Sequence, residues 1–296
     1  MPFLCKIISI GAVMNQDIKF HCTINGNFRN KDQQIRAFLF TDYFIEPHDH
    51  AFYEMNIVLS GKGYQQIGEH CFEVAVGDVF VIPPNTVHSY YETHQLAVYH
   101  ILIKSEFLAA HQDVSRGVAG YLQLTEIEPF LRKNFSKAMF LHLSHYQLLR
   151  FKEEIKFIDD HGEYGNNEFA PMKQHAVMKL IYWFSQLLNQ QLKLGKQSVT
   201  NYENAVINAL EYIHQKYDTH ITVQTLCELT YMSRSTFLRS FSRICGCSPA
   251  QYIDRYRCGK AIEMLEKGGI SKTQVAHSCG FYDLSHMLRK LQAHTE

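Results

Sequence analysis

The stretch LCELTYMSRSTFLRSFSRICGCSPAQYIDRYRCGKAIEML, residues 226–265, decides the fold of the C-terminal part of this 296-residue chain. Thr222 stands just before it as a helix-capping residue, and Leu226 and Leu229 are spaced to face inward from a short helix. A tight turn follows, and Ser233 then caps a second helix. The sequence therefore predicts a helix-turn-helix unit at this position.

The second helix of this unit has two different faces. Phe237 and Phe241 lie four residues apart, so they share one face and are expected to be buried. The opposite face then carries Arg234, Ser235, Leu238, Arg239 and Ser242. Side chains in the first turns of such a helix can reach base edges in the major groove, where an arginine binds guanine or holds a phosphate.

The pattern occurs a second time, weakly, at an offset of 50 residues. The aligned pairs are Tyr231 with Phe281, Ser233 with Asp283, Phe237 with Met287, Leu238 with Leu288, Arg239 with Arg289 and Phe241 with Leu291. Ser248-Pro249 is expected to begin a long helix that separates the two copies and ends at Gly268-Gly269. In the second copy the outward residues are predicted to be Leu284, Ser285, Leu288 and Arg289.

Residues 226–265, followed by QVAHSCGFYDLSHMLRK at 274–290, resemble the AraC/XylS family of transcription regulators. The resemblance runs from about Tyr202 to the end of the chain. It implies two recognition helices, held by the long helix, that enter successive major grooves about one helical turn, or ~34 Å, apart. The residues proposed to contact DNA are Arg234, Ser235, Leu238, Arg239, Leu284, Ser285, Leu288 and Arg289.

The chain departs from this family at its end. The family usually continues past the second recognition helix with a Gly-x-x-Pro-x-x-Tyr-Arg segment, whereas this sequence stops at Glu296. The second unit also carries Met287 and Leu291 where the family often has phenylalanine, which predicts looser packing and weaker DNA contacts. A regulator with only one working unit is therefore kept as an alternative. At the other end, Met14 is an alternative start to Met1.

Overall charge neither favours nor excludes a nucleic-acid partner, because 29 basic residues balance 29 acidic ones. Basic charge is nevertheless local, since between residues 231 and 260 a single acid, Asp254, faces Arg234, Arg239, Arg243, Arg255, Arg257 and Lys260. The eight cysteines form no CxxC pair, which argues against a zinc ribbon or a thioredoxin-type site. No uncharged apolar segment approaches 18 residues and no leader precedes one, so we expect a cytoplasmic protein without membrane contact.

The N-terminal part reads as strands and the middle as helices. Short β-branched and aromatic runs appear as RAFLF, EMNIVLSG, KGYQQIG, FEVAVGD, VFVIPPN and HQLAVYHILI between residues 36 and 103. From Ser105 to about Leu194 apolar residues recur at helical spacing, with loops expected at 161–171 and 195–201. The predicted division is an extension at 1–34, a barrel at 35–104, helices for linkage and dimerisation at 105–195, and a tandem helix-turn-helix domain at 196–296.

Two motifs in the strand region resemble those of cupins. HDHAFYEMNIVLSG at 48–61 is H-x-H-x3-E-x6-G, and GDVFVIPPNTVH at 77–88 is G-x5-P-x-N-x2-H. The even spacing of His48, His50 and Glu54 lets them face one side of a strand, and turns can bring His88 to them. Three imidazoles and a carboxylate suit Zn, Ni, Fe or Mn with open positions for a ligand. The alternative is a barrel that binds its effector by hydrogen bonds alone.

The fold class predicted is thus an α+β chain with a cupin-type jelly-roll barrel, a helical linker and an all-α C-terminal domain. Tyr53, Tyr64 and Tyr90 are candidates for stacking on a small effector such as a sugar. The predicted function is an effector-responsive, non-enzymatic regulator that binds promoter DNA as a homodimer and contacts RNA polymerase. The rival class is a metal-dependent cupin enzyme with a helical accessory domain, which would leave Arg239 and Arg289 without a role.

Overall fold

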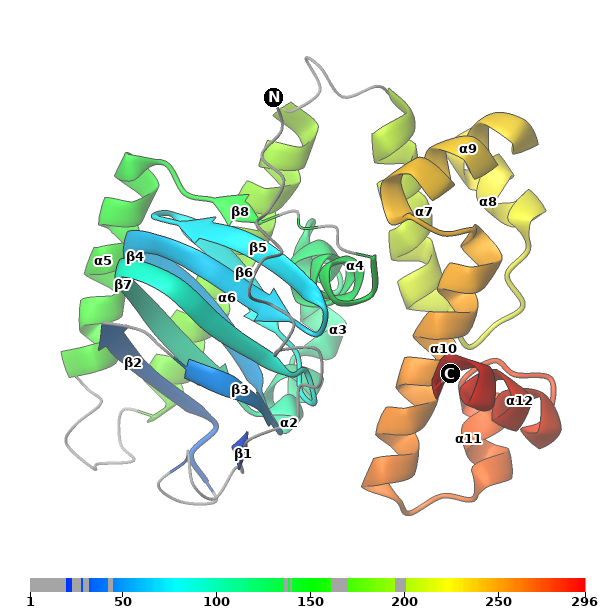
Figure 1. Ribbon diagram of the computed structural model, residues 1–296, viewed down its shortest axis with the longest axis horizontal. Helices are drawn as coiled ribbons and strands as arrows, with labels where there is room; N and C mark the ends of the chain where they lie inside the picture. Colours follow the sequence, from blue (N-terminus) through cyan, green and yellow to red (C-terminus); the bar gives the residue numbers. More distant parts are fainter. Residues whose placement is uncertain are drawn as a thin grey trace. The chain divides into compact units, whose positions relative to one another are not determined.

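The computed structural model forms two compact units, one at residues 1–189 and one at 190–296, which are described separately (Figure 1). The structure describes residues 20–22, 28, 32–41, 45–135, 138, 140–160, 170–194 and 201–295. The predicted loops at 161–171 and 195–201 therefore fall largely outside the described residues. Within those described residues, no helix is long and apolar enough to cross a membrane.

The first unit is built on one eight-stranded sheet. Its strands are β1 (Phe20–Cys22), β2 (Ile35–Thr41), β3 (Ile45–His50), β4 (Tyr53–Ile67), β5 (His70–Ala75), β6 (Asp78–Ile82), β7 (His88–Ile103) and β8 (Leu141–His142). Strands β4 and β7 pair antiparallel along their whole length. The outer edge of β4 pairs with β6 at one end and with β5 at the other. The outer edge of β7 pairs with β2 at one end and with β3 at the other. The runs EMNIVLSG and KGYQQIG, predicted as separate strands, are therefore one strand, β4.

The sheet curls back on itself into a barrel. Glu54 pairs with Leu102 near one end of β7, whereas His88 begins the other end. An extended strand would separate those two ends by roughly 45 Å, at about 3.3 Å per residue. Yet a carboxylate oxygen of Glu54 lies 3.7 Å from His88 Nε2. Only a sheet whose ends fold over one another permits that distance, so the predicted jelly-roll architecture is confirmed.

The bend in β4 and β7 is located at Gly61. The pairing register shifts between Val58 and Tyr64, and Gly61 adopts φ +71° there. A Cβ at Gly61 would lie only 2.2 Å from the carbonyl oxygen of Gln95 on β7. Gln95 itself has φ +50°, so both strands leave regular geometry at the same place. The glycine of the first cupin-like motif is therefore required by the close approach of two bent strands.

The first unit also contains helices. They are α2 (Ser105–Ala110), α3 (Gln112–Ser115), the π-helical turn η2 (Gln123–Ile127), α4 (Glu128–Phe135), α5 (His145–Asp160) and α6 (Ala170–Leu194). Of these, α5 covers one face of the sheet and leaves the other for the barrel interior. Tyr99 of β7 packs edge-on against Phe151 of α5, with ring centroids 5.9 Å apart. The opposite face carries the buried cluster Val58, Val74, Phe80, Ile82, Tyr90, Leu96 and Val98. This alternation is what a half-covered strand predicts.

A buried arginine ties α4 to the barrel interior. Arg132 is fully buried, and its guanidinium donates to Gln65 Oε1 at 2.6 Å and to the carbonyl oxygen of Val81. It also forms an ion pair with Glu128, one helical turn earlier, at 3.1 Å. Gln65 in turn donates to the Tyr90 hydroxyl at 2.9 Å. Because every one of these groups is buried, the network fixes α4 against the β4 end that carries Gln65.

Between residues 201 and 295, the described part of the second unit forms six helices. They are α7 (Asn201–Lys216), α8 (Val223–Thr230), α9 (Arg234–Cys245), α10 (Pro249–Lys267), α11 (Lys272–Ser278) and α12 (Leu284–Thr295). Helix α10 runs from the α8–α9 pair to the α11–α12 pair, as predicted (Figure 1). Buried Phe237 and Phe241 of α9 pack in the first pair, where the Phe241 ring meets Tyr252 of α10 edge-on at 5.7 Å. In the second pair, Met287 and Val275 pack with Cys258 and Ala261 of α10.

The start of α10 allows a stability prediction. Ser248 accepts a hydrogen bond from the Gln251 backbone N–H, and the Gln251 side chain accepts one from the Ser248 backbone N–H, which makes a full capping box with Pro249 at the first helical position. Ser248→Ala should therefore lower the free energy of unfolding by about 1 kcal/mol in chemical denaturation. Ser242→Ala, at an exposed serine within α9, is the control. Equal stability of the two variants would contradict the role given to this cap.

Candidate functional site

The first helix-turn-helix unit has the predicted caps. Thr222 accepts from the Thr225 backbone N–H and Ser233 from that of Thr236. Between the two helices, Tyr231 adopts the left-handed conformation, with φ 54° and ψ 33°, and ends α8. Leu226 is buried as predicted, but the inward orientation predicted for Leu229 is wrong, because this side chain is 39% exposed. The short helix α8 buries one row of side chains, Leu226 and Cys227, against α7 and α9.

Helix α9 separates its apolar and polar faces as the sequence indicates. Phe237 and Phe241 are fully buried, whereas Arg234, Ser235, Arg239 and Ser242 are exposed and Leu238 is half-buried. The exposed face begins in the first turn of the helix, where the backbone N–H groups also point outward. Its arginine side chains are thus positioned to meet an anionic surface.

Helix α12 provides the corresponding face of the second unit. Asp283 Oδ1 accepts from the His286 backbone N–H at 2.6 Å, the capping role that Ser233 has in the first unit. Ser285, Leu288 and Arg289 are exposed, in agreement with the sequence analysis. Leu284 was predicted to point outward, but it is half-buried and packs against the core cluster that contains Met287. It is held there because it lies three residues before Met287, on the same side of the helix.

The two units do not superpose at a single sequence offset. Thr222 and Ser271 are equivalent caps, which gives an offset of 49 for the first helices, whereas Ser233 and Asp283 give 50 for the second helices. The alignment of Tyr231 with Phe281 is therefore wrong. Tyr231 is 98% exposed, whereas Phe281 is buried in the core. The turn of the second unit contains one residue more than that of the first.

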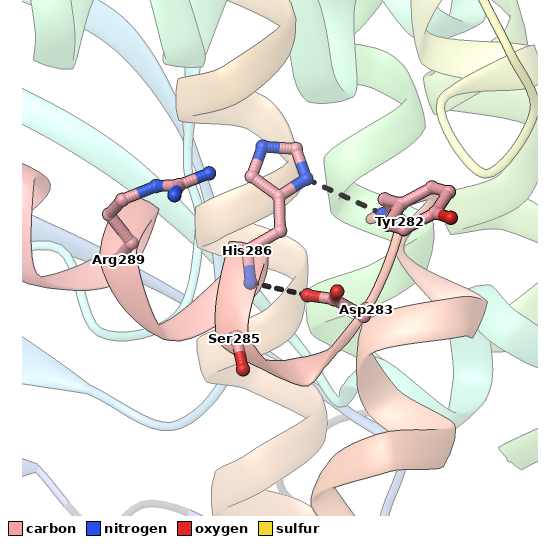
Figure 2. A pocket seen from close by; sticks show the side chains of 5 residues that line it. All are labelled: Tyr282, Asp283, Ser285, His286 and Arg289. Atoms are coloured by element: carbon pink, nitrogen blue, oxygen red, sulfur yellow. Dashed lines mark hydrogen bonds between the residues drawn. The ribbon is translucent and has the colours of Figure 1, made fainter.

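A hollow of about 300 Å³ lies beside the start of α12 and is lined by Tyr282, Asp283, Ser285, His286 and Arg289 (Figure 2). The Tyr282 backbone N–H donates to His286 Nδ1 at 3.4 Å, so the Nε2 atom carries the ring hydrogen. Figure 2 shows the Arg289 guanidinium on the side of His286 opposite Tyr282. Sequence reasoning missed Tyr282 and His286, because an exposed tyrosine and a lone histidine have no distinctive spacing.

Part of the basic cluster is structural. The Arg257 guanidinium donates to the carbonyl oxygens of Tyr217 at 2.7 Å and Thr219 at 2.6 Å, which fastens α10 to the end of α7. Lys260 lies 3.4 Å from Glu263 in an exposed ion pair. Lys290 forms a 2.6 Å ion pair with Asp254 that joins α12 to α10. The cationic surface proposed for a partner is thus centred on Arg234 and Arg239 of α9 and on Arg289 of α12.

The cupin-like residues meet inside the barrel. His48, Glu54 and His88 are buried and offer ligand atoms that all lie within 4.8 Å of one another. His50 Nε2 lies 3.0 Å from Glu54 Oε2 and is also buried. His48 and His50 come from β3 and Glu54 from β4, so two strands supply what the spacing placed on or beside one strand. The four residues named from the sequence are thus brought together.

His100 is a further member of this cluster that sequence reasoning missed. Its Nδ1 donates to Glu54 Oε1 at 2.6 Å, and its ring stacks on Phe38 with centroids 5.2 Å apart. It pairs with Asn56 across β4 and β7, far from the two motifs in sequence. No spacing rule could have found it, because the contact exists only after the strands pair. The hydrogen bond holds one Glu54 oxygen and leaves the other facing His50 and His88.

The protonation states suit metal coordination. His88 Nδ1 donates to the Thr86 carbonyl oxygen at 2.9 Å and His48 Nδ1 to that of Glu46 at 3.0 Å, so each Nε2 keeps its lone pair. Burial lowers the pKa of His88 well below its ordinary value and lowers that of His48. Burial alone would raise the pKa of Glu54, but the charge and hydrogen bond of His100, together with His50, hold this pKa well below its usual range. The neutral imidazoles of His48 and His88 beside the Glu54 carboxylate form a donor set that fits a divalent transition metal.

These pKa shifts predict how the metal-free protein responds to acid. Because the pKa of His88 is lower in the folded than in the unfolded protein, its contribution to stability is present above 6.5 and is lost as the pH falls below that value. The lowered pKa of Glu54 adds a second loss, below 4.5. Chelator-treated protein should therefore unfold at lower denaturant concentration at pH 5.5 than at 7.5, and His88→Gln should reduce that difference. An unchanged difference would contradict the assignment to His88.

The three tyrosines proposed for effector contact do not share one place. Tyr90 is buried inside the barrel and accepts the hydrogen bond from Gln65. Tyr64 is half-buried and stacks on Tyr91, its cross-strand partner, with centroids 5.6 Å apart. It precedes Gln65, and Tyr53 precedes Glu54, so both lie on the face opposite the interior residues. Of the three tyrosines, Tyr90 alone therefore lies in the interior. Tyr53 and Tyr64 face away from it because side chains alternate between the two faces of a strand.

Comparison with known proteins supports both halves of this description. The family model "Helix-turn-helix domain" matches residues 226–296, and the model "AraC-like ligand binding domain" matches residues 36–145. The chain belongs to the AraC family of transcription regulators. The two matched ranges together cover the barrel and helices α8 to α12. It also decides against the cupin-enzyme alternative, since the family consists of regulators.

Relatives of the same AraC-family type align over most of the chain. The "HTH-type transcriptional activator RhaS" of Escherichia coli O81 (strain ED1a) is 24% identical over 243 residues, which cover 81% of this chain and 80% of the relative. The "Uncharacterized HTH-type transcriptional regulator YdeC" of Bacillus subtilis (strain 168) is 23% identical over 273 residues, covering 84% and 82%. Among solved structures, the DNA-binding domain of AdpA in complex with a target DNA is 27% identical, covers 30% of this chain and 79% of that chain, and has a TM-score of 0.29.

Proposed function

We propose that the protein is an effector-responsive regulator that recognises promoter DNA through both helix-turn-helix units and is controlled by a small molecule bound in the barrel. The observation that carries this proposal is the equivalent exposure of Arg239 on α9 and Arg289 on α12, each six residues after the residue that caps its helix. Two such helices on one long connecting helix can reach two successive major grooves.

The DNA contacts are assigned by exposure. Arg239 and Arg289 are proposed to contact guanine edges or phosphates, with Arg234, Ser235, Leu238, Ser285 and Leu288 beside them. Leu284 stays a candidate for DNA contact, and its half-buried side chain also packs against the cluster that contains Met287. Since Asp283 caps the start of α12 and Lys290 on α12 is paired with Asp254, we expect the first unit to supply the greater share of the electrostatic attraction.

The barrel is proposed to hold a divalent transition metal on His48, His50, Glu54 and His88, with Zn, Ni, Fe and Mn as candidates. When bound, such a metal would act as a Lewis acid that accepts an oxygen ligand from the effector. The effector class proposed is a small oxygen-rich molecule such as a sugar. Of the three tyrosines, Tyr90 is the one placed to contact it. For any regulation, the effector must bind one arrangement of the protein better than another.

The remaining parts of the proposal concern partners and place. Helices in the 105–195 region are proposed to form a homodimer, and the DNA-bound protein is proposed to contact RNA polymerase in the cytoplasm. The domain limits proposed are those drawn from the sequence, at residues 34, 104 and 195.

The proposed DNA recognition is tested by gel shift on the region upstream of the protein's own gene. Site-specific retardation that weakens steeply with salt is expected, because each phosphate contact releases counterions. Footprinting distinguishes two protected half-sites from one, and a single half-site would support the alternative in which one unit works. Absence of retardation at low salt, with and without a sugar panel, would overturn the proposed function.

A further inference from the structure

Tyr231 occupies a backbone conformation that a bulky residue rarely adopts. Its φ of 54° and ψ of 33° belong to the left-handed region, where the Cβ meets the carbonyl oxygen. The position is set by the end of α8, since the Tyr231 N–H bonds to the Glu228 carbonyl oxygen and the Met232 N–H to that of Cys227. Glycine is the usual residue at such a helix end. The side chain gains nothing visible from packing, because it is 98% exposed.

The second unit shows how the same turn is made without this strain. Gly280 takes the left-handed position there, with φ 73°, and its N–H and that of Phe281 make the equivalent hydrogen bonds to α11. A Cβ at Gly280 would lie 2.5 Å from the Tyr217 carbonyl oxygen, so glycine is required. Even so, the longer turn presents a tyrosine to solvent, Tyr282, which is 86% exposed. Both turns therefore present an exposed tyrosine shortly before the cap of a recognition helix, Tyr231 two residues before Ser233 and Tyr282 immediately before Asp283.

We infer that Tyr231 is a DNA-backbone contact, whose hydroxyl donates to a phosphate oxygen, and that Tyr282 makes the corresponding contact in the second unit. The inference rests on the proposed function. Strain retained at an exposed side chain points to a role outside the folded chain itself. The neighbouring Arg234 and Arg239 of α9 are exposed and outnumber the one acid of α8, Glu228, so the adjoining surface favours an anionic polymer. Tyrosine is among the side chains that hydrogen-bond phosphate at protein–DNA interfaces.

A contact of this kind has properties that separate it from an arginine contact. The tyrosine hydroxyl carries no charge, so its loss should leave the slope of log affinity against log salt unchanged. A phosphate carries no sequence information, so the loss should weaken specific and non-specific DNA by the same factor. Removing Arg239 should instead reduce the salt slope by about 1, because one phosphate-neutralising charge disappears.

The test uses the full chain and three variants. Tyr231→Gly removes the strain and the side chain, so the unfolding midpoint of the helical unit should rise by roughly 4 °C while affinity for DNA falls about fivefold or more. Tyr231→Phe keeps the ring and the strain but removes the hydroxyl, so stability should stay unchanged while affinity falls to a similar extent. Tyr202→Phe, at an exposed tyrosine of α7, is the matched control and should change neither quantity.

The outcomes are decisive in either direction. Opposite movement of stability and affinity in Tyr231→Gly, with a parallel affinity loss in Tyr231→Phe at unchanged salt slope, supports the inference. Unaltered affinity in both variants would overturn it, and so would a Tyr231→Phe that binds like the wild type. If the wild-type chain itself fails to bind the upstream DNA above non-specific level, the proposed specificity fails, whereas the tyrosine contact is still measured on non-specific duplex.

Discussion

Replacing Arg239 and Arg289 together by alanine is expected to weaken binding to the upstream operator by about 30-fold or more. Each arginine that reads a base pair contributes about 1–3 kcal/mol of discrimination, and the two sites are on separate helices, so their effects should add. Both side chains are exposed on faces opposite buried Phe237 and Met287, so their removal leaves the core intact. Fluorescence anisotropy with labelled operator at a fixed salt concentration gives the affinity.

Single variants show whether both units work. If each recognition helix contacts DNA, Arg239→Ala and Arg289→Ala should each lower affinity, and the double variant should lose the product of the two factors. Arg116→Ala, at an exposed arginine of the first unit, is the control and should bind normally. An Arg289→Ala protein that binds like the wild type would assign recognition to the first unit alone. Normal binding by the double variant would refute the assignment of both helices.

Replacing His48 and His50 together by alanine is expected to abolish metal binding by the barrel. These side chains supply two of the four proposed ligands, and both are buried beside Glu54. Zinc or nickel content after dialysis, measured by elemental mass spectrometry, should fall from about one per chain to background. The second unit forms its own core, so its helical signal should be retained.

The control for this experiment is a double change at surface histidines. His94 is exposed and His142 forms an exposed pair with Asp78, so removing both leaves the interior cluster untouched. That variant should bind metal as the wild type does. Equal metal content in all three proteins would refute the site, and absence of metal from the wild type after incubation with each candidate ion would favour effector binding by hydrogen bonds alone.

Local pattern predicted much of the helical unit because its helices obey local rules. The four-residue spacing of Phe237 and Phe241 fixed the buried face of α9, and Ser248-Pro249 fixed the start of α10. The inward prediction for Leu229 is wrong, and Leu284 is only partly exposed, for a shared reason. Whether a flanking leucine is buried depends on which neighbouring helix lies beside it, which periodicity alone does not contain.

The barrel was predictable in its motifs but not in its closure. His48, His50, Glu54 and His88 could be named from spacing, whereas His100 joins them through the long-range pairing of β4 with β7. Likewise, two predicted strands are one, since the irregularity at Gly61 bends the chain without ending its ladder. The equivalence of Tyr231 and Phe281 failed because a repeat scored at one fixed offset cannot register an added turn residue.

The continuity of β4 and β7 through the Gly61 bend has a mechanical consequence. Glu54 near one end of β4 and Gln65 near its other end lie on one continuous strand, and Gln65 is held by the buried Arg132 of α4. A guest that pushes the barrel walls apart at the histidines would also change the curvature of both strands. The Gln65 end of β4 would then displace α4 through the buried hydrogen bond between Arg132 and Gln65. Binding inside the barrel would thereby shift helix α4 through the strands and Arg132, without movement of a connecting loop.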